Sequence, residues 1–215
     1  MEYVKVCGLK ETEHIELCSE NKANAVGFIY NVPSSPRNLE KSKLMNLLND
    51  IPKNLLRVVV FKPQNVLELE KITNEIDVDL YQIHNNFEEQ ELDEISIDLK
   101  KKIILALQVN PSNKDDVINK INKYYDQFFG FLIDNSEGHG TEFNFNMVAD
   151  IIDNTKGASI IVAGGININN IEIIIKNLNP YGIDVSSSLE SEKGVKDPLK
   201  IENFLKKVNE IKKTL

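Results

Sequence analysis

The sequence of 215 residues predicts one α/β domain over residues 1–215, a TIM (β/α)8 barrel of parallel strands. Short apolar runs alternate with amphipathic segments along the whole chain, which indicates a parallel sheet covered by helices. Eight such units occur, and eight units close a barrel. No apolar run is followed by G-x-G-x-x-G, which disfavours the alternative, an open doubly wound sheet.

Each strand is predicted from a short run that is rich in β-branched and aromatic side chains and ends at small or polar residues. In chain order the predicted strands are residues 3–6, 25–30, 55–61, 79–84, 103–109, 128–134, 160–163 and 182–185. The third strand, LLRVVVF, is almost continuously apolar, which is typical of a strand buried on both faces. The first strand alternates and brings Cys7 to its C-terminal end.

A helix is predicted after each strand, from apolar residues spaced three or four positions apart. The predicted helices are residues 11–20, 44–51, 66–76, 88–97, 114–125, 146–154 and 168–176, followed by a last one that begins at Pro198. Pro52 ends the second helix, and Asp197 precedes Pro198 as an N-cap. Residues 88–97 are acidic and weakly patterned, and they give the weakest helix signal.

Composition and charge restrict the class of protein. The hydrophobic fraction of 41% and the charged fraction of 27% are close to globular averages. The formal net charge of −8 disfavours a nucleic-acid partner. No apolar run is long enough to span a membrane, so a cytoplasmic protein without a membrane partner is expected. Cys7 and Cys18 match no metal-ligand spacing, so reduced thiols and no metal site are expected.

The last two predicted strands both end at small residues that suit an anion. Residues 160–163 end at Gly164 and Gly165, and residues 182–185 end at Ser186, Ser187 and Ser188. Glycine and serine let a backbone approach an anion closely, and phosphate commonly binds at the loops after strands seven and eight of a TIM barrel. Either turn alone also fits an ordinary connection without a ligand. The two in sequence favour a phosphate site.

Polar residues at the other strand ends are the candidates for chemistry, because a TIM barrel carries its active site there. They are Cys7, Arg37, His84, Asp134, His139 and Asp184. From its type alone, Cys7 is equally an inert buried thiol. Asp134 ends an apolar strand, where its charged form is disfavoured and a protonated acid is available, and the next helix begins too far away for Asp134 to be its N-cap. A loop arginine such as Arg37 is often only solvated, but its planar fork suits a carboxylate.

Together these residues resemble the phosphoribosylanthranilate isomerase family, and the match covers nearly the whole chain. The matching motifs are KVCGL at 5–9, VGFIY with SPR at 35–37, QIH at 82–84, FLID at 131–134, AGGI at 163–166 and GIDVSS at 182–187, followed by GVKDPLKI. The sequence departs from the family pattern at Glu137, His139, Asn144 and Phe145, in the loop after the sixth strand, and at Ser188.

The resemblance implies an isomerase of tryptophan biosynthesis. It places the general base at Cys7, the general acid at Asp134 and the contact to the anthranilate carboxylate at Arg37. It places the phosphate at Gly164, Gly165, Ile166, Ser186 and Ser187, and His84 and Asp184 are further candidates for substrate binding. The reaction it implies is the Amadori rearrangement of N-(5-phosphoribosyl)anthranilate, with no cofactor.

The partners expected are a small phosphorylated substrate and, in a homodimer, a second copy; a monomer is the other possibility. Other functions remain open at this point. One is a related sugar-phosphate barrel, either the aminoaldose isomerase of histidine biosynthesis or indoleglycerol-phosphate synthase. The histidine enzyme is expected to carry an aspartate where Cys7 stands, and the synthase a catalytic lysine in the barrel. Another is a barrel that binds a phosphorylated ligand without turnover.

Overall fold

Eight parallel strands close into a barrel in the computed structural model, which describes residues 1–85, 87–134, 143–155 and 157–214. The strands are β1 (Tyr3–Cys7), β2 (Ala25–Tyr30), β4 (Leu56–Phe61), β5 (Leu80–His84), β6 (Ile103–Gln108), β7 (Gly130–Asp134), β8 (Ile160–Ala163) and β9 (Gly182–Val185). Each pairs with the next in this order, and β1 also pairs with β9, which closes the ring. The predicted TIM barrel is confirmed, with strand boundaries shifted by at most two residues.

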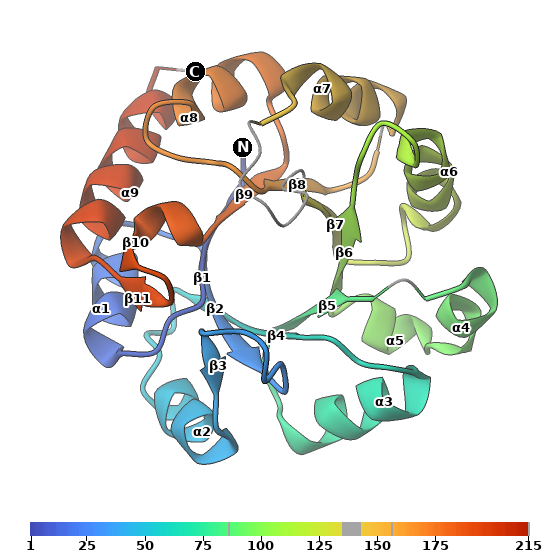
Figure 1. The fold of residues 1–215 in the computed structure, drawn as a ribbon, viewed down its shortest axis with the longest axis horizontal. Coiled ribbons are helices and arrows are strands. Elements are labelled where there is room, and N and C mark those ends of the chain that lie inside the picture. The colour runs from blue at the N-terminus through green and yellow to red at the C-terminus, as the bar shows by residue number, and fades with distance from the viewer. Residues whose placement is uncertain (86, 135–142, 156, 215) are drawn as a thin grey trace.

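Helices surround this ring of strands, and the view down the barrel in Figure 1 shows them on its outside. They are α1 (Thr12–Glu20), α2 (Lys41–Asn49), α3 (Val66–Glu75), α4 (Glu89–Glu94), α5 (Ile97–Lys100), α6 (Lys114–Tyr124), α7 (Phe145–Asn154), α8 (Ile171–Ile173) and α9 (Pro198–Lys212). The N-cap of α9 is confirmed, because the side chain of Asp197 accepts hydrogen bonds from the backbone N–H groups of Leu199 and Lys200. The last helix, α9, packs against α1, so the first and last helices of the chain lie side by side on the outside of the barrel.

Two predicted helices differ in the structure. The single helix expected over residues 88–97 is divided into α4 and α5, because Ile95 takes an extended conformation and Ser96 caps the new helix through Leu99. The helix expected over residues 168–176 begins later, and α8 continues as a π-helical turn over Ile174–Leu178. Both segments are helical as predicted, but where each helix begins and breaks depends on how the segment packs.

Short elements absent from the sequence analysis follow β2 and β9. A two-residue strand, β3 (Asn38–Leu39), extends the sheet beside β2. After β9 come a 3-10 turn (Ser187–Leu189) and a small antiparallel hairpin of β10 (Glu190–Glu192) and β11 (Val195–Lys196). These strands are too short to give a periodic signal in the sequence.

The apolar core has two layers because side chains of a strand alternate between its faces. The larger layer lies between the strands and the helices. The smaller layer fills the barrel interior with Tyr3, Cys7, Ala25, Val58, Val60, Leu80, Ile104, Ala106, Leu132, Ile161 and Ala163. Burying a large aliphatic or aromatic side chain contributes about 1.5–3 kcal/mol, so both layers stabilise the ring. Polar side chains also occur on the interior face, and they are described below.

Within the described residues, none of the helices combines the length and the apolar character needed to cross a lipid bilayer.

Candidate active site

A cavity of about 440 Å³ opens at the C-terminal ends of the strands. The predicted site residues that line it are Cys7, Arg37, His84, Asp134, Gly164, Gly165, Ile166, Asp184, Ser186 and Ser187. The sequence therefore located the residues that the barrel brings together at one mouth. His139 lies outside the described residues, as does Glu137.

Cys7 is the last residue of β1 and is buried, with 5% of its surface exposed. Burial raises the pKa of its thiol, while the positive charge of Lys5 and a hydrogen bond from it act in the opposite direction. The carbonyl oxygen of Cys7 accepts a hydrogen bond from the hydroxyl of Ser186 at 3.0 Å. This bond joins the ends of β1 and β9, so the backbone that carries the thiol is fixed.

Asp184 on β9 lines the cavity and forms a buried ion pair. Its Oδ2 atom lies 2.8 Å from the ammonium nitrogen of Lys5, and Gln82 donates to the same oxygen at 3.3 Å. Lys5 is fully buried, and Asp184 is only 7% exposed. Asp184 therefore has a structural partner in addition to the substrate contact predicted for it.

His84 and Asp134 stand at the ends of β5 and β7, respectively. Burial lowers the pKa of His84, although the negative charge of Asp134 opposes that effect. The Nε2 atoms of Gln82 and His84 are 3.0 Å apart. The neutral form of His84 is thus favoured near neutral pH, and its ring offers the cavity a polar group without a full charge.

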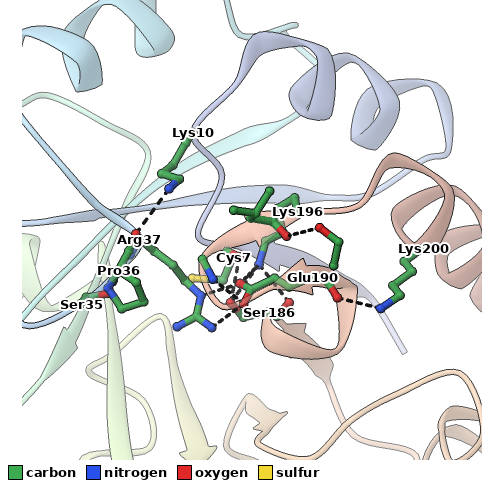
Figure 2. A network of polar contacts seen from close by, with 12 residues as sticks. Cys7, Lys10, Ser35, Pro36, Arg37, Ser186, Glu190, Lys196 and Lys200 are labelled. Carbon is green, nitrogen blue, oxygen red and sulfur yellow. Dashed lines mark hydrogen bonds and ion pairs between the residues drawn. The ribbon is translucent and has the colours of Figure 1, made fainter.

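Arg37 is held by a carboxylate of the chain itself. Its Nε atom donates to Oε1 of Glu190 at 2.5 Å, and its Nη2 atom donates to Oε2 at 2.8 Å. Glu190 also accepts from Lys196 Nζ at 2.8 Å and from the backbone N–H of Gly194 at 2.9 Å. Burial alone would raise the pKa of Glu190, but these donors outweigh it and hold the pKa at about 2. Figure 2 shows Arg37 and Lys196 converging on Glu190 close to Cys7.

The two predicted phosphate loops lie next to each other on β8 and β9. Gly164 and Gly165 have φ angles of 80° and 70°, a region that favours glycine, and the side chain of Asn170 donates to the carbonyl of Gly165 at 2.8 Å. Ser186 is already engaged, since its hydroxyl donates to Cys7 and accepts from Lys196. Ser187 is exposed and is the free hydroxyl of the pair within the described part of the chain.

Several residues of the site and its surroundings escaped the sequence analysis: Lys5, Gln82, Glu190, Lys193 and Lys196. Lys5 carried a usable signal, because a lysine between Tyr3 and Cys7 in an alternating strand faces the barrel interior. Gln82 carried the same signal two residues before His84. Glu190 and Lys196 carried none, since their importance depends on a hairpin that folds back towards Arg37.

Comparison with known proteins identifies the family. Residues 4–207 match the family model described as N-(5'phosphoribosyl)anthranilate (PRA) isomerase. The N-(5'-phosphoribosyl)anthranilate isomerase of Clostridium acetobutylicum is 31% identical over 214 residues, which cover 97% of this chain and 98% of that protein. The solved phosphoribosyl anthranilate isomerase of Thermotoga maritima is 24% identical, with a TM-score of 0.81 over 98% of this chain and 100% of the other.

A second solved chain of the same description is a complex with reduced 1-(o-carboxyphenylamino)-1-deoxyribulose 5-phosphate. It is also 24% identical, with a TM-score of 0.80, over 98% of this chain and 100% of that one. At 24% identity the two solved structures show the fold alone. The family is shown by the full-length match to the family model and by the 31% identical relative. The chain therefore belongs to the N-(5'-phosphoribosyl)anthranilate isomerases, the TIM-barrel enzymes of tryptophan biosynthesis.

Proposed function

We propose that this isomerase uses Cys7 as general base and Asp134 as general acid in the Amadori rearrangement of N-(5'-phosphoribosyl)anthranilate. The product is 1-(2-carboxyphenylamino)-1-deoxyribulose 5-phosphate. The observation that carries the proposal is that both side chains line the cavity that also contains the two glycine and serine loops. A cavity of about 440 Å³ is of the size that binds small phosphorylated molecules.

The two groups come from separate parts of the barrel wall. Cys7 ends β1 and Asp134 ends β7, with β9 and β8 between them in the sheet. A substrate between them can receive a proton from one group and lose a proton to the other. This separation suits a reaction in which different substrate atoms gain and lose a proton.

In the first step Asp134 donates its proton to the ribose ring oxygen. The bond from that oxygen to C1' breaks, and the nitrogen lone pair forms a C1' iminium. The carboxylate left on Asp134 is at the end of an apolar strand, close enough to His84 for its charge to act on that imidazole.

In the second step the thiolate of Cys7 removes the proton from C2'. The C–H electron pair becomes the C1'–C2' double bond and neutralises the iminium, which gives an enolamine. The enolamine then tautomerises to the ketone. Both steps are proton transfers, so two positioned side chains suffice to carry them.

The binding roles follow from the same cavity. The guanidinium of Arg37 donates hydrogen bonds to the anthranilate carboxylate. The loops at Gly164–Ile166 and Ser186–Ser187 bind the phosphate through backbone N–H groups. Positive φ angles at Gly164 and Gly165 support the second role, because they turn the backbone at the strand end. Lys193 adds a cation to the cavity lining, which favours an anionic ligand in a chain of net charge −8. His84 and Asp184 complete the set of proposed substrate contacts.

The decisive experiment is the decay of phosphoribosylanthranilate fluorescence with the purified protein and with Cys7→Ala and Asp134→Asn. Loss of a general acid or base costs about a hundred- to ten-thousand-fold in rate, so kcat should fall by that factor in each variant while product affinity is retained. Cys18→Ala is the matched control, because Cys18 is buried on α1 and does not line the cavity. Turnover within about tenfold of the parent would remove the mutated group from the mechanism.

A further inference from the structure

Lys5 is a fully buried lysine inside the barrel, on the same strand face as Cys7. Lysine is almost never fully buried without a partner, because its charge loses hydration. Its partner is Asp184, which is opposite Lys5 in the register of β1 and β9 and accepts a hydrogen bond from it at 2.8 Å. Burial lowers the pKa of Lys5, but Asp184 and Cys7 more than compensate, so the pKa is raised overall and the ammonium is protonated near neutral pH.

Gly27 on β2 has no side chain, and this leaves room for the ammonium of Lys5 and the sulfur of Cys7. Gly27 is opposite Cys7 in the register of β1 and β2. A Cβ atom at Gly27 would lie 2.8 Å from Nζ of Lys5 and 3.0 Å from Sγ of Cys7. A side chain there would crowd both the ammonium and the sulfur, so these two groups lie next to the same small space. A glycine within a strand often marks such a close approach.

Lys5 is the cation with the largest effect on the thiol. The titratable and charged groups around Cys7 are Tyr3 and Lys5 on β1, Asp184 on β9, Arg37 after β2, and Lys196 on β11. Burial has the largest effect, so the pKa of Cys7 is raised overall, and the charge of Lys5 is the strongest influence that lowers it. Lys196 lowers it less, and its ammonium bonds to Glu190 and Ser186.

We propose that Lys5 is a positioning residue for Cys7, whose ammonium lies next to the sulfur inside the barrel and stabilises, against the effect of burial, the thiolate that a base requires. The inference rests on the proposed function in taking Cys7 as the base. When the C2'–H bond breaks and the S–H bond forms, the electron pair goes to the substrate and Lys5 keeps its proton. Asp184 then remains as the partner of Lys5, so the ammonium is paired both before and after the transfer.

The test measures thiol titration directly, by the pH dependence of iodoacetamide alkylation of Cys7. Cys18→Ala is the background for all variants, although Cys18 should react little, since burial raises its pKa to about 12. In Lys5→Met the midpoint of alkylation should rise by about one pH unit or more. In Asp184→Asn it should fall, because a negative charge next to the thiol is removed. A purely structural ion pair would not shift the midpoint in opposite directions.

Lys100→Met is the matched control, because Lys100 is also a buried lysine but bonds to Gln127 at a distance from the cavity. It should leave the midpoint unchanged. Equal midpoints in the parent and in Lys5→Met would overturn the proposal. Should Lys5→Met not fold, the double variant Lys5→Met/Asp184→Asn removes both charges together. Its midpoint should still lie above that of the parent, and an unchanged midpoint would overturn the proposal in the same way.

Alkylation requires no turnover, so this test is separate from the test of the proposed mechanism. If Cys7→Ala retained activity, Cys7 would not be the base, yet the shift in Lys5→Met would still establish the pairing. With both correct, the acid limb of the kcat profile should move to higher pH in Lys5→Met by the same amount as the alkylation midpoint.

Discussion

Arg37 and Glu190 form a two-point ion pair at the mouth of the barrel, with Nε–Oε1 and Nη2–Oε2 distances of 2.5 and 2.8 Å. The pair connects the segment after β2 to the hairpin after β9, across 153 positions of sequence. Within the described residues it uses Nε and Nη2, which leaves the Nη1 hydrogens of the guanidinium for a ligand. Glu190 thus fixes the plane and position of the group that is proposed to bind the substrate carboxylate.

Replacing Arg37 should weaken substrate binding more than it slows chemistry. In Arg37→Ala the loss should be about 1.5–3 kcal/mol, the contribution of a charged hydrogen bond, and it should appear in KM. Lysine should restore only part of the affinity, because it lacks the planar fork. The control ligand is ribulose 5-phosphate, which has no aryl carboxylate and should bind parent and variant equally. An equal loss for both ligands would show that Arg37 has a structural role or serves the phosphate.

Glu190 should make stability depend on pH in a defined window. Its pKa in the folded chain is about 2, whereas an unfolded glutamate titrates near about 4.3. A pKa that is lower in the folded state stabilises the fold above the unfolded value, and this stabilisation disappears as the pH falls to about 2. Urea unfolding of the parent and Glu190→Gln should therefore differ most above pH ~4.3 and converge towards pH ~2. A difference that stays constant across this range would contradict the assignment.

The phosphate loops should respond to bulk at Gly165 and hardly to the loss of a hydroxyl at Ser187. If backbone N–H groups bind the phosphate, room for approach matters more than the side chain. Gly165→Val should raise KM strongly, since its φ of 70° is also unfavourable for a β-branched residue. Ser187→Ala should raise KM only slightly, and inorganic phosphate should inhibit the parent competitively. Parent-like binding by Gly165→Val would place the phosphate elsewhere.

Ser188 should tolerate replacement by glycine. Its hydroxyl is buried and, within the described residues, has no hydrogen-bond partner, and the family pattern prefers glycine here. Ser188→Gly removes this unpaired hydroxyl, so substrate affinity should stay unchanged or improve slightly. Isothermal titration with the product and both proteins measures this effect. A clear loss of affinity would show that the Ser188 hydroxyl contacts the ligand.

The sequence by itself determined the eight strands, their C-terminal ends and most of the residues at the barrel mouth. These features depend on local patterns, because an apolar run and the residue that ends it are neighbours in the chain. Cys7, Asp134 and Gly164 could be placed at one edge of the sheet because parallel strands end at the same edge. Helix type was less predictable, since the π-helical turn after α8 and the break between α4 and α5 depend on packing.

Only the tertiary structure decided which charges neutralise one another. Lys5 and Asp184 are 179 positions apart, and they pair because β1 and β9 meet where the barrel closes. Arg37 meets Glu190 because a short hairpin folds back onto the segment after β2. Neither contact has a local signal, since an ion pair depends on the distance between two atoms in space. The residue types at the site could therefore be predicted from the sequence. The charges that surround Cys7 and Arg37 could not, because they come together only when the barrel closes.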